Sequence, residues 1–358
     1  MNVSDFDFLL PDELIAQTAA PRGASRLLVL DRVSGARRHA RIADLPSLLQ
    51  RGDLVVVNNT RVFAARLLGH RIPSGGAVEC LLIGPATAEA GFPPADPGAG
   101  LYDALMHPGH KLKPGARVRF EGAAGGLTAE VVARHFHGRR TIRLWSDTGL
   151  GVDALVDALG HVPLPPYIKR ADTAADRERY QTIFARVRGS VAAPTAGLHF
   201  SSDLIAELGD RGIERADVTL HVGYGTFKPV RAARVEDHVV DPERYDISAG
   251  TSAAISRAKC EGRRVIAVGT TTTRALEDSA LRGGGQVIPG AGMASVFIYP
   301  GHRFQAIDGL LTNFHLPSSS LLMLVAAFAG KDHVLDAYRE AVVERYRFYS
   351  YGDAMLIV

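Results

Sequence analysis

The sequence has little cysteine, no long apolar run and no signal-like start. Cys80 and Cys260 are far apart along 358 residues, which excludes a disulfide framework and a CxxC zinc or redox site. We expect both cysteines to be small buried side chains. The longest apolar run, residues 321–329, is far shorter than the ~20 residues that cross a bilayer. Residues 1–7 carry acids where a secretory signal carries bases, so we expect a cytoplasmic protein without membrane attachment.

An excess of one charge is also missing. Lys and Arg number 41 against 38 acids, and a net charge of +3 is too small to indicate nucleic-acid binding by itself. The arginines do cluster, since residues 134–143 contain no acid and residues 32–41 hold four arginines. Such runs are usually solvated strand faces, and contact with RNA is the alternative. With 46% apolar and 22% charged residues, the chain reads as a globular protein of roughly two domains at about 150 residues each.

Short apolar runs separated by Gly and Pro dominate the first half of the chain. We expect strands at residues 53–57, 62–68, 78–83, 102–106, 117–120, 127–132 and 141–145. Their near-regular spacing predicts a small antiparallel barrel or sandwich, with residues 85–100 as a surface loop.

A strand–loop–helix rhythm replaces this pattern from about residue 185. Strands are expected at residues 189–193, 218–222, 264–268 and 310–314. Hydroxyl side chains that can cap the intervening helices are Ser201 or Ser202, Thr251 or Ser252, and Ser318 or Ser319. This alternation predicts a layered α/β domain with partly parallel strands. We assign residues 1–60 and 152–358 to that domain, and residues 61–151 to an inserted barrel.

Three turns between a strand and a helix carry unusual polar residues, at positions 193–200, 269–274 and 312–318. Ligands of open α/β sheets bind beyond the carboxyl ends of the strands, where such turns lie. The free N–H groups of each new helix suit a carboxylate or a phosphate. One exposed helix end contributes only ~0.3–1 kcal/mol, whereas millimolar binding needs about 4 kcal/mol. Several turns must therefore converge on one ligand.

Histidines and threonines in these turns are the candidate chemical groups. His199 and His315 occupy equivalent turns next to Thr195 and Asn313, which favours acid–base work over two structural histidines. His221 adds a third imidazole at a strand end. The four threonines of residues 270–273 are either helix caps or an anion site, and Arg274 favours the anion.

Other familiar chemical motifs are absent. Residues 221–227 fail as a dinucleotide-binding turn because the third glycine is missing, and no HExxH, P-loop, GxSxG or metal-ligand spacing occurs. The remaining hypothesis is a metal-free enzyme that uses loops and histidines.

Two further segments stand out. Residues 160–170 form a stiff, proline-rich stretch with a basic end, suited to a linker or to a partner surface. Residues 346–355 are dense in aromatic side chains. Core packing is the commoner role for such a run, while aromatic faces also suit a sulfonium cation or a stacked base.

The amino-acid sequence of these segments closely resembles that of the S-adenosylmethionine:tRNA ribosyltransferase-isomerase family of the queuosine pathway. The resemblance runs almost from end to end. Its blocks are residues 6–16, 57–67, 160–168, 180–182, 189–200, 219–230, 264–277, 297–301, 311–317 and 347–355.

The resemblance implies a fold and a reaction. The fold is a three-layer α/β/α sandwich with a mixed sheet and an inserted small antiparallel Greek-key β-barrel. The reaction transfers and isomerises the ribosyl part of S-adenosylmethionine onto 7-aminomethyl-7-deazaguanine at the wobble position of tRNA. The products are epoxyqueuosine in tRNA, adenine and methionine. S-adenosylmethionine would be a donor substrate, with no prosthetic group and no metal, and we expect a monomer.

Site residues are predicted from the turns together with this resemblance. We assign general acid–base roles among His199, His221 and His315, without saying which is the acid. The methionine carboxylate is assigned to Thr270, Thr271, Thr272, Thr273 and Arg274. Other predicted substrate contacts are Thr195, Asn313, Asn58, Asn59, Arg61, Tyr349, Tyr351 and Asp353. Predicted tRNA phosphate contacts are Lys169, Arg170, Arg139 and Arg140.

Two competing functions are considered. An ordinary S-adenosylmethionine methyltransferase is disfavoured because the expected Gly-rich first turn is missing. A catalytically silent RNA-binding protein is disfavoured because the family's sequence blocks around all three histidines are intact, whereas a protein that only binds RNA would tolerate losses there.

Overall fold

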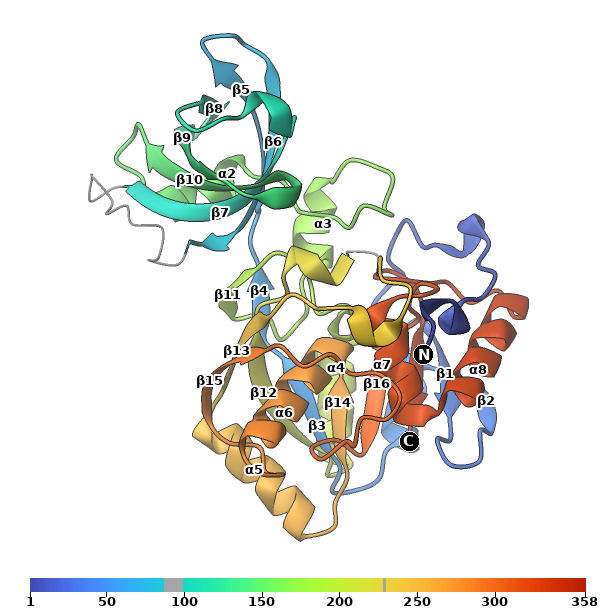
Figure 1. The fold of residues 1–358 in the computed structure, drawn as a ribbon. Coiled ribbons are helices and arrows are strands. Elements are labelled where there is room, and N and C mark those ends of the chain that lie inside the picture. Colours follow the sequence, from blue (N-terminus) through green and yellow to red (C-terminus); the bar gives the residue numbers. More distant parts are fainter. Residues whose placement is uncertain (87–98, 228–229) are drawn as a thin grey trace. The chain divides into compact units, whose positions relative to one another are not determined.

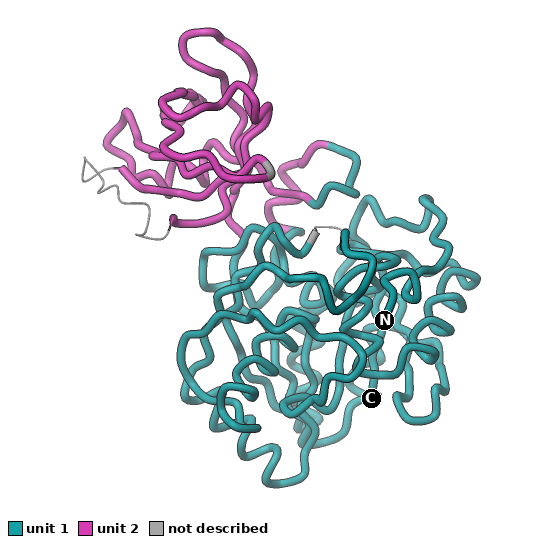
Figure 2. Tube along the Cα trace, viewed as in Figure 1, with its two compact units in different colours: residues 1–61, 165–170, 179–358 teal, residues 62–164, 171–178 magenta. Residues whose placement is uncertain are grey.

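The computed structural model describes residues 1–86, 99–227 and 230–358, which divide into two compact units (Figure 2). The first unit comprises Met1–Arg61, Pro165–Arg170 and Arg179–Val358, and the second Val62–Leu164 and Ala171–Glu178. The loop expected at residues 85–100 lies mostly outside the described residues. Whether the chain folds as domains with the boundaries expected from the sequence stays a prediction.

A nine-stranded mixed sheet forms the centre of the first unit, in the order β15-β13-β12-β3-β14-β16-β17-β1-β2. Its strands are β1 (Arg26–Leu30), β2 (Arg37–Arg41), β3 (Leu54–Asn58), β12 (Glu214–Leu220), β13 (Glu243–Ile247), β14 (Val265–Val268), β15 (Gly290–Ala294), β16 (Gly309–Asn313) and β17 (Ala354–Ile357). The central strands β12, β3, β14 and β16 run parallel. This confirms the predicted mixed sheet.

Both faces of this sheet are buried, as β3 shows. Leu54 and Val56 enter one apolar cluster, while Val55 and Val57 enter another, because successive side chains of a strand point to opposite faces. The first cluster contains side chains of α5 (Ala249–Cys260), α6 (Thr270–Arg282), α7 (Ser320–Ala329) and α8 (Lys331–Val343). The second contains side chains of α1 (Leu45–Leu48) and α4 (Ser202–Asp210). Figure 1 shows α5, α6 and α7 over one face, and the arrangement is the expected three-layer sandwich.

Serine caps begin helices α4, α5 and α7, with one difference from expectation. The Oγ atoms of Ser201 and Ser319 accept hydrogen bonds from Leu204 N and Leu322 N, as predicted. Helix α5 begins earlier than expected, because Ser248 caps it by accepting from Thr251 N. Its last residue, Cys260, is exposed, so the expectation that both cysteines are buried is wrong for this one.

The second unit contains a closed antiparallel barrel in the order β10-β7-β6-β5-β8-β9. Its strands are β5 (Arg66–Ile72), β6 (Ala77–Pro85), β7 (Ala99–His107), β8 (Arg117–Gly122), β9 (Gly125–Arg134) and β10 (Arg139–Ser146). Three consecutive strands, β5 to β7, are followed by β8, which returns beside β5. This is the predicted Greek key. Cys80 lies in the barrel interior, where burial raises the pKa of its thiol to about 12.

One expected strand is interrupted. Residues 62–68 were expected to be continuous, but β4 (Thr60–Val62) ends before β5 begins, and β4 pairs with β11 (Val187–Ser190) in a separate small sheet. The second unit also contains helix α2 (Val152–Leu159) and most of helix α3 (Ala174–Arg179). Of the helices described, none combines the length and apolar character that a membrane span needs.

Candidate active site

Parallel strands bring the predicted polar turns to one edge of the sheet. The carboxyl ends of β12, β3, β14 and β16 lie at this edge. Strand β17 starts there because Ala354 pairs with Asn313, the last residue of β16, and β1 starts there because Leu27 pairs with Ala354. Residues that flank these strand ends, far apart in sequence, are thereby gathered as expected for an open α/β sheet.

His199 is at the centre of the best-defined polar cluster of this edge. It ends the 3₁₀ helix η7 (Thr195–His199), and its Nδ1 lies 3.0 Å from Ser25 Oγ. Its Nε2 lies 3.2 Å from Nδ2 of Asn313, and the same Nδ2 donates to the carbonyl of Tyr349 at 3.0 Å. Because the amide nitrogen can only donate, Nε2 accepts and Nδ1 carries the proton that is donated to Ser25. Asn313 and Ser25 together select one tautomer of His199.

Burial makes this imidazole neutral. His199 is 4% exposed, and desolvation, with added repulsion from Arg179 and other cations, lowers its pKa to about 3. Arg22 and Arg179 also donate to the carbonyl of Leu198, which holds η7 in place. The lone pair of Nε2 accepts the N–H of Asn313 in this structure, so His199 can take up a proton at neutral pH only when that hydrogen bond opens.

Two buried polar atoms have no hydrogen-bond partner among the described residues: Oδ1 of Asn313, whose Nδ2 contacts His199, and the hydroxyl of Tyr349, whose ring is in the same apolar cluster as Tyr338. Tyr349 also has a left-handed backbone (φ 72°), which costs a non-glycine residue ~1–3 kcal/mol. Its ring stacks on Tyr167 with centroids 4.2 Å apart. Unpaired buried groups and backbone strain are typical of a ligand site. The sequence indicated Asn313 and Tyr349, but it missed Ser25, which carries no motif signal.

His221 lies at the same edge, farther along it. Its Nδ1 lies 2.8 Å from Thr60 Oγ1, and burial lowers its pKa, with Arg244 adding to the effect. The ring sits over Gly189, where an added Cβ would come within 2.6 Å of it. His221 follows β12, whereas the Asn313 contact of His199 is on β16, and three strand spacings separate these strand ends by about 14 Å.

His315 is on the opposite face of the sheet from His199. Its Nε2 lies 2.9 Å from Thr312 Oγ1, and its backbone N–H donates to the hydroxyl of Tyr338 on α8. Thr312 alternates with Asn313 along β16, so the two side chains point to opposite faces. Burial lowers the pKa of His315 to about 3. Within the described residues, the three histidines do not form one cluster.

The four threonines at the start of α6 divide into two pairs. Thr272 and Thr273 donate their hydroxyls to the carbonyls four residues earlier, of Val268 and Gly269, so these hydroxyls are used within the helix and do not cap it. Thr270 and Thr271 follow Gly269, whose added Cβ would lie 3.6 Å from Cβ of Ala196. This helix start therefore adjoins η7 and the His199 cluster.

Arg274 is engaged within the protein. Its guanidinium forms a buried ion pair with Glu243 at 2.6 Å and donates to the carbonyl of Ala294. Burial raises the pKa of Glu243, against the opposing effect of Arg274. Because this positive charge is already paired, a ligand carboxylate would have to compete with Glu243.

Three other predicted substrate contacts hold the backbone or pack in the interior. Asn58 donates to the carbonyl of Leu220 and accepts from Leu220 N. Asp353 accepts from Arg26 N and Arg347 N, and the buried ring of Tyr351 packs edge-on against Tyr180. Thr195 is partly buried within η7, and Arg61 is exposed on β4. In contrast, Asn59 has an open donor and is treated below.

The predicted tRNA contacts differ strongly in exposure. Arg140 is 1% exposed and donates to the carbonyls of Gly109 and Leu112, so its guanidinium holds the barrel together and does not face a phosphate. Arg139 is exposed and pairs with Asp103. In the first unit, Lys169 is exposed, and Arg170 donates to the carbonyl of Gln17.

A nine-stranded α/β sandwich with a closed Greek-key barrel and a polar sheet edge defines the class of protein. The family model described as "Queuosine biosynthesis protein" matches residues 3–357. The chain belongs to this family.

Relatives match over their full length. The S-adenosylmethionine:tRNA ribosyltransferase-isomerase of Heliobacterium modesticaldum is 49% identical over 359 residues, covering 100% of both chains. The protein of the same name from Anaeromyxobacter sp. is 51% identical, covering 100% of this chain and 99% of its own. The crystal structure of S-adenosylmethionine tRNA ribosyltransferase from Thermotoga maritima is 36% identical, with a TM-score of 0.55, and covers 99% of this chain and 100% of its own.

Proposed function

We propose that this chain is an S-adenosylmethionine:tRNA ribosyltransferase-isomerase of queuosine biosynthesis. It transfers the ribosyl part of S-adenosylmethionine to 7-aminomethyl-7-deazaguanine at the wobble position of tRNA and isomerises it. The products are epoxyqueuosine in tRNA, adenine and methionine. The observation that supports this most strongly is identity of about half of all residues, over the full length, with relatives that carry this name.

The chemistry needs a base and, later, a proton for the departing adenine. The sulfonium acidifies the adjacent ribose carbon, so a positioned base can remove a proton there and leave an ylide. All three predicted histidines have a lowered pKa, so each is neutral at physiological pH. A neutral imidazole suits the base, whereas an acid must first gain its proton during turnover. We assign the base to His199, whose Nε2 takes up a proton when the hydrogen bond from Nδ2 of Asn313 opens; Oδ1 of the same amide has no partner among the described residues.

The other substrate-binding roles are assigned from the position and exposure of each side chain. Thr270 and Thr271 are the candidates for the methionine carboxylate, since their helix start adjoins η7. The Tyr167–Tyr349 stack offers an aromatic face to the sulfonium or to a base. The exposed Lys169 and Arg139 and the partly buried Arg170 stay candidates for tRNA phosphates. We propose no prosthetic group, a monomer and a cytoplasmic location, where tRNA is available.

Doubly labelled substrate tests the function. The protein is incubated with tRNA that carries the modified base and with S-adenosylmethionine labelled separately in ribose and methyl. Ribose label entering tRNA together with free adenine is the expected result. Methyl label entering tRNA would identify a methyltransferase, and tRNA binding without turnover would identify a silent RNA-binding protein.

A further inference from the structure

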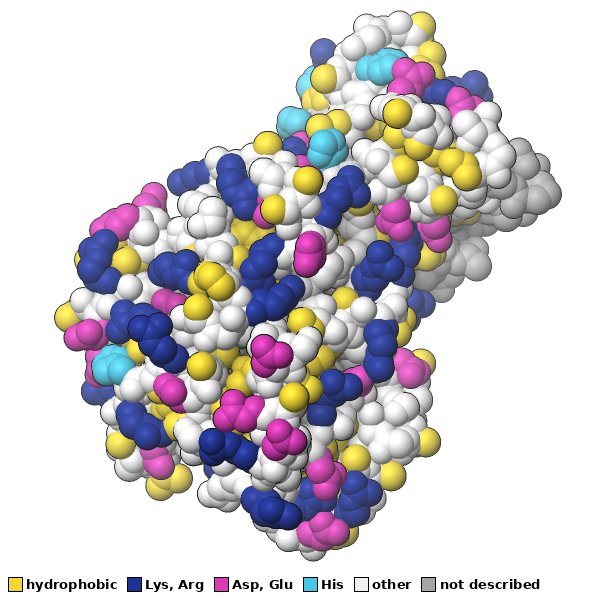
Figure 3. Space-filling view, turned by 180° about the vertical axis from the view of Figure 1, so that it is seen from behind, with side chains coloured by type: hydrophobic (Ala, Val, Ile, Leu, Met, Phe, Trp, Pro, Cys, Tyr) yellow, Lys and Arg dark blue, Asp and Glu magenta, His cyan; other side chains and the backbone are white. Residues whose placement is uncertain are grey.

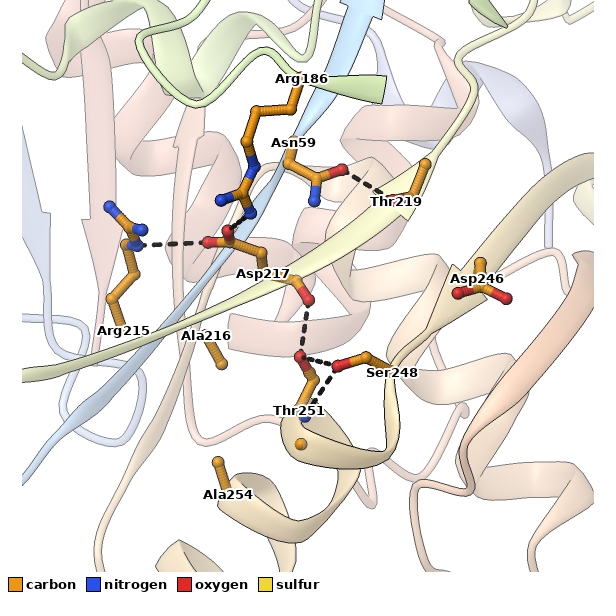
Figure 4. Close-up of a pocket in the computed structure, with 11 residues that line it drawn as sticks. Asn59, Arg186, Arg215, Ala216, Asp217, Thr219, Asp246, Ser248, Thr251 and Ala254 are labelled. Atoms are coloured by element: carbon orange, nitrogen blue, oxygen red, sulfur yellow. Dashed lines mark hydrogen bonds and ion pairs between the residues drawn. The ribbon is translucent and has the colours of Figure 1, made fainter. Parts of the chain in front are cut away.

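A hollow of about 390 Å³ lies beside β12, where the sheet opens (Figure 4). Strand β13 pairs with β12 only at Thr219 and Leu220, so among the described residues the first part of β12 has no strand on that side. The beginning of α5 fills part of this space, where the hydroxyl of Thr251 donates to the carbonyl of Asp217. All of the residues that line the hollow belong to the first unit.

Asn59 presents an open donor to this hollow. The residue is 8% exposed, and its Oδ1 accepts from Thr219 Oγ1 at 2.7 Å. Its Nδ2 has no hydrogen-bond partner among the described residues, and Figure 4 shows this nitrogen pointing into the hollow. This nitrogen is not among the buried atoms that lack a partner, so it is open to solvent and can donate to a ligand acceptor in place of water. In the neighbouring Asn58, both polar side-chain atoms bond to the backbone of Leu220. Of these two amides, Asn59 is the one that can donate to a ligand in the hollow.

Two arginines stand beside this amide. Arg186 is 62% exposed and Arg215 is 41% exposed, and both pair with Asp217. The backbone N–H of Arg186 donates to the carbonyl of Asn59, and the guanidinium of Arg215 lies 5.6 Å from the ring centroid of Phe184. Since each guanidinium has five N–H donors, pairing with Asp217 orients the two arginines and leaves donors open.

The N–H donors of the hollow, from Asn59, Arg186 and Arg215, therefore lie on one of its walls. Asp246 is an exposed carboxylate on another wall, so two arginines and two aspartates leave no net charge. Selection of a ligand rests on geometry: Asn59, Arg186 and Arg215 all offer N–H groups to an acceptor with several oxygens. Figure 3 also shows many Lys and Arg side chains over this face of the first unit.

We propose that this hollow binds a phosphodiester oxyanion of the tRNA backbone. The inference rests on the proposed function. Of the residues that would contact tRNA here, the sequence analysis predicts only Asn59 as a substrate contact. The hollow lies close to the catalytic edge, because Thr219, which holds Asn59, is two residues before His221 on the same chain segment. A carboxylate, such as that of the methionine part of the donor, presents related oxyanion chemistry, and the experiment separates the two sources.

Single substitutions in the full-length protein test the proposal. Arg186→Gln and Arg215→Gln each leave Asp217 with one arginine, and Asn59→Asp keeps the acceptor for Thr219 while removing the donor. Arg339→Gln is the matched control, since Arg339 is also 62% exposed and paired with one aspartate, Asp336 on α8. The Kd of an unmodified tRNA transcript is measured over a range of salt concentrations, together with the KM for S-adenosylmethionine.

We expect each test variant to raise the Kd for tRNA about tenfold, the loss of one charge-assisted hydrogen bond. Each arginine variant should also reduce the slope of log K against log salt by about 1. The control should change Kd less than twofold, and the KM for S-adenosylmethionine should stay unchanged in all variants.

Unchanged tRNA affinity and salt slope in all three variants would overturn the inference. A raised KM for S-adenosylmethionine with unchanged tRNA affinity would also overturn it, and would assign the hollow to a carboxylate of the donor. If the wild-type protein transfers ribose while the variants bind tRNA normally, only this inference fails. A wild-type protein without ribosyl transfer contradicts the proposed function instead, whatever its salt slope.

Discussion

The two faces of β16 give similar histidines different surroundings. On one face, Asn313 bonds to His199, which a second partner, Ser25, also holds. On the other face, Thr312 bonds to His315, next to the hydroxyl of Tyr338. Burial lowers the pKa of both imidazoles to about 3. Of the two, His199 contacts an amide whose Oδ1 is unpaired among the described residues and whose Nδ2 also bonds to the backbone of the strained Tyr349, so a lowered pKa alone does not identify a catalytic histidine.

Removing each imidazole is the strongest way to break this comparison. We expect His199→Ala to lower kcat at least 100-fold, because general base help is worth about 10²–10⁴-fold. His315→Ala should lower kcat less than tenfold. Single-turnover ribosyl transfer measures both effects, and circular dichroism checks that each variant is folded.

His221→Ala completes that series. A loss below about tenfold at all three histidines would contradict histidine acid–base catalysis, and a larger loss at His315 than at His199 would reverse the comparison.

Removing the partners of His199 should have a smaller effect. Ser25→Ala leaves Nδ1–H without its acceptor and frees the orientation of the ring, while Asn313 still fixes the tautomer, so we expect kcat to fall about tenfold, close to one hydrogen bond. The KM for tRNA should not change. Ser25→Thr, which keeps the hydroxyl, serves as the control and should recover most of the loss; equal losses in both variants would indicate a packing effect.

The pH dependence of stability sharpens the comparison further. The pKa of His199 is lower in the folded chain, about 3, than its unfolded value of about 6.5. The unfolded state therefore binds more protons between these values, and the free energy of unfolding falls as pH falls from about 6.5 toward 3. The contribution is about 1.4 kcal/mol per pH unit for one group.

Denaturant unfolding of wild type and His199→Gln between pH 7 and pH 4.5 measures this contribution. The wild type should lose more stability than the variant as pH falls. Parallel curves would show that His199 is not kept neutral by burial.

The smallest expected effect is at Tyr349. Tyr349→Phe removes a buried hydroxyl that has no partner among the described residues, so the free energy of unfolding without substrate should rise by about 1 kcal/mol. If this hydroxyl binds the donor, the KM for S-adenosylmethionine should rise at the same time. Thermal unfolding and steady-state kinetics measure the two, and Tyr351→Phe is the nearby control. If Tyr349→Phe is more stable and its KM for S-adenosylmethionine is unchanged, the hydroxyl of Tyr349 does not contact this substrate.

Much of the fold could be predicted because it depends on local patterns. Apolar runs such as residues 264–268 and caps such as Ser201 and Ser319 appear where expected. The differences are also local: Ser248 caps α5 ahead of the expected residues, and the strand expected at residues 62–68 is interrupted. Neither difference changes the architecture.

The candidate site was predictable only in part. Turn chemistry indicated His199 and Asn313, and the aromatic run of residues 346–355 indicated Tyr349. Arg274 and Arg140, in contrast, are bonded to groups distant in sequence, Glu243 and the carbonyl of Gly109. An arginine in a polar or basic segment looks the same in sequence whether its partner is a ligand or its own protein. Ser25 was missed for the same reason, since its partner is 174 residues away.

The amino-acid sequence by itself determined the layered sheet, the Greek-key barrel and the family, because periodicity, caps and long matching blocks are properties of consecutive residues. Tertiary structure decided which face of β16 each histidine joins and which arginines are already paired. Those outcomes depend on side chains brought together by strand order and alternation, which local sequence does not encode.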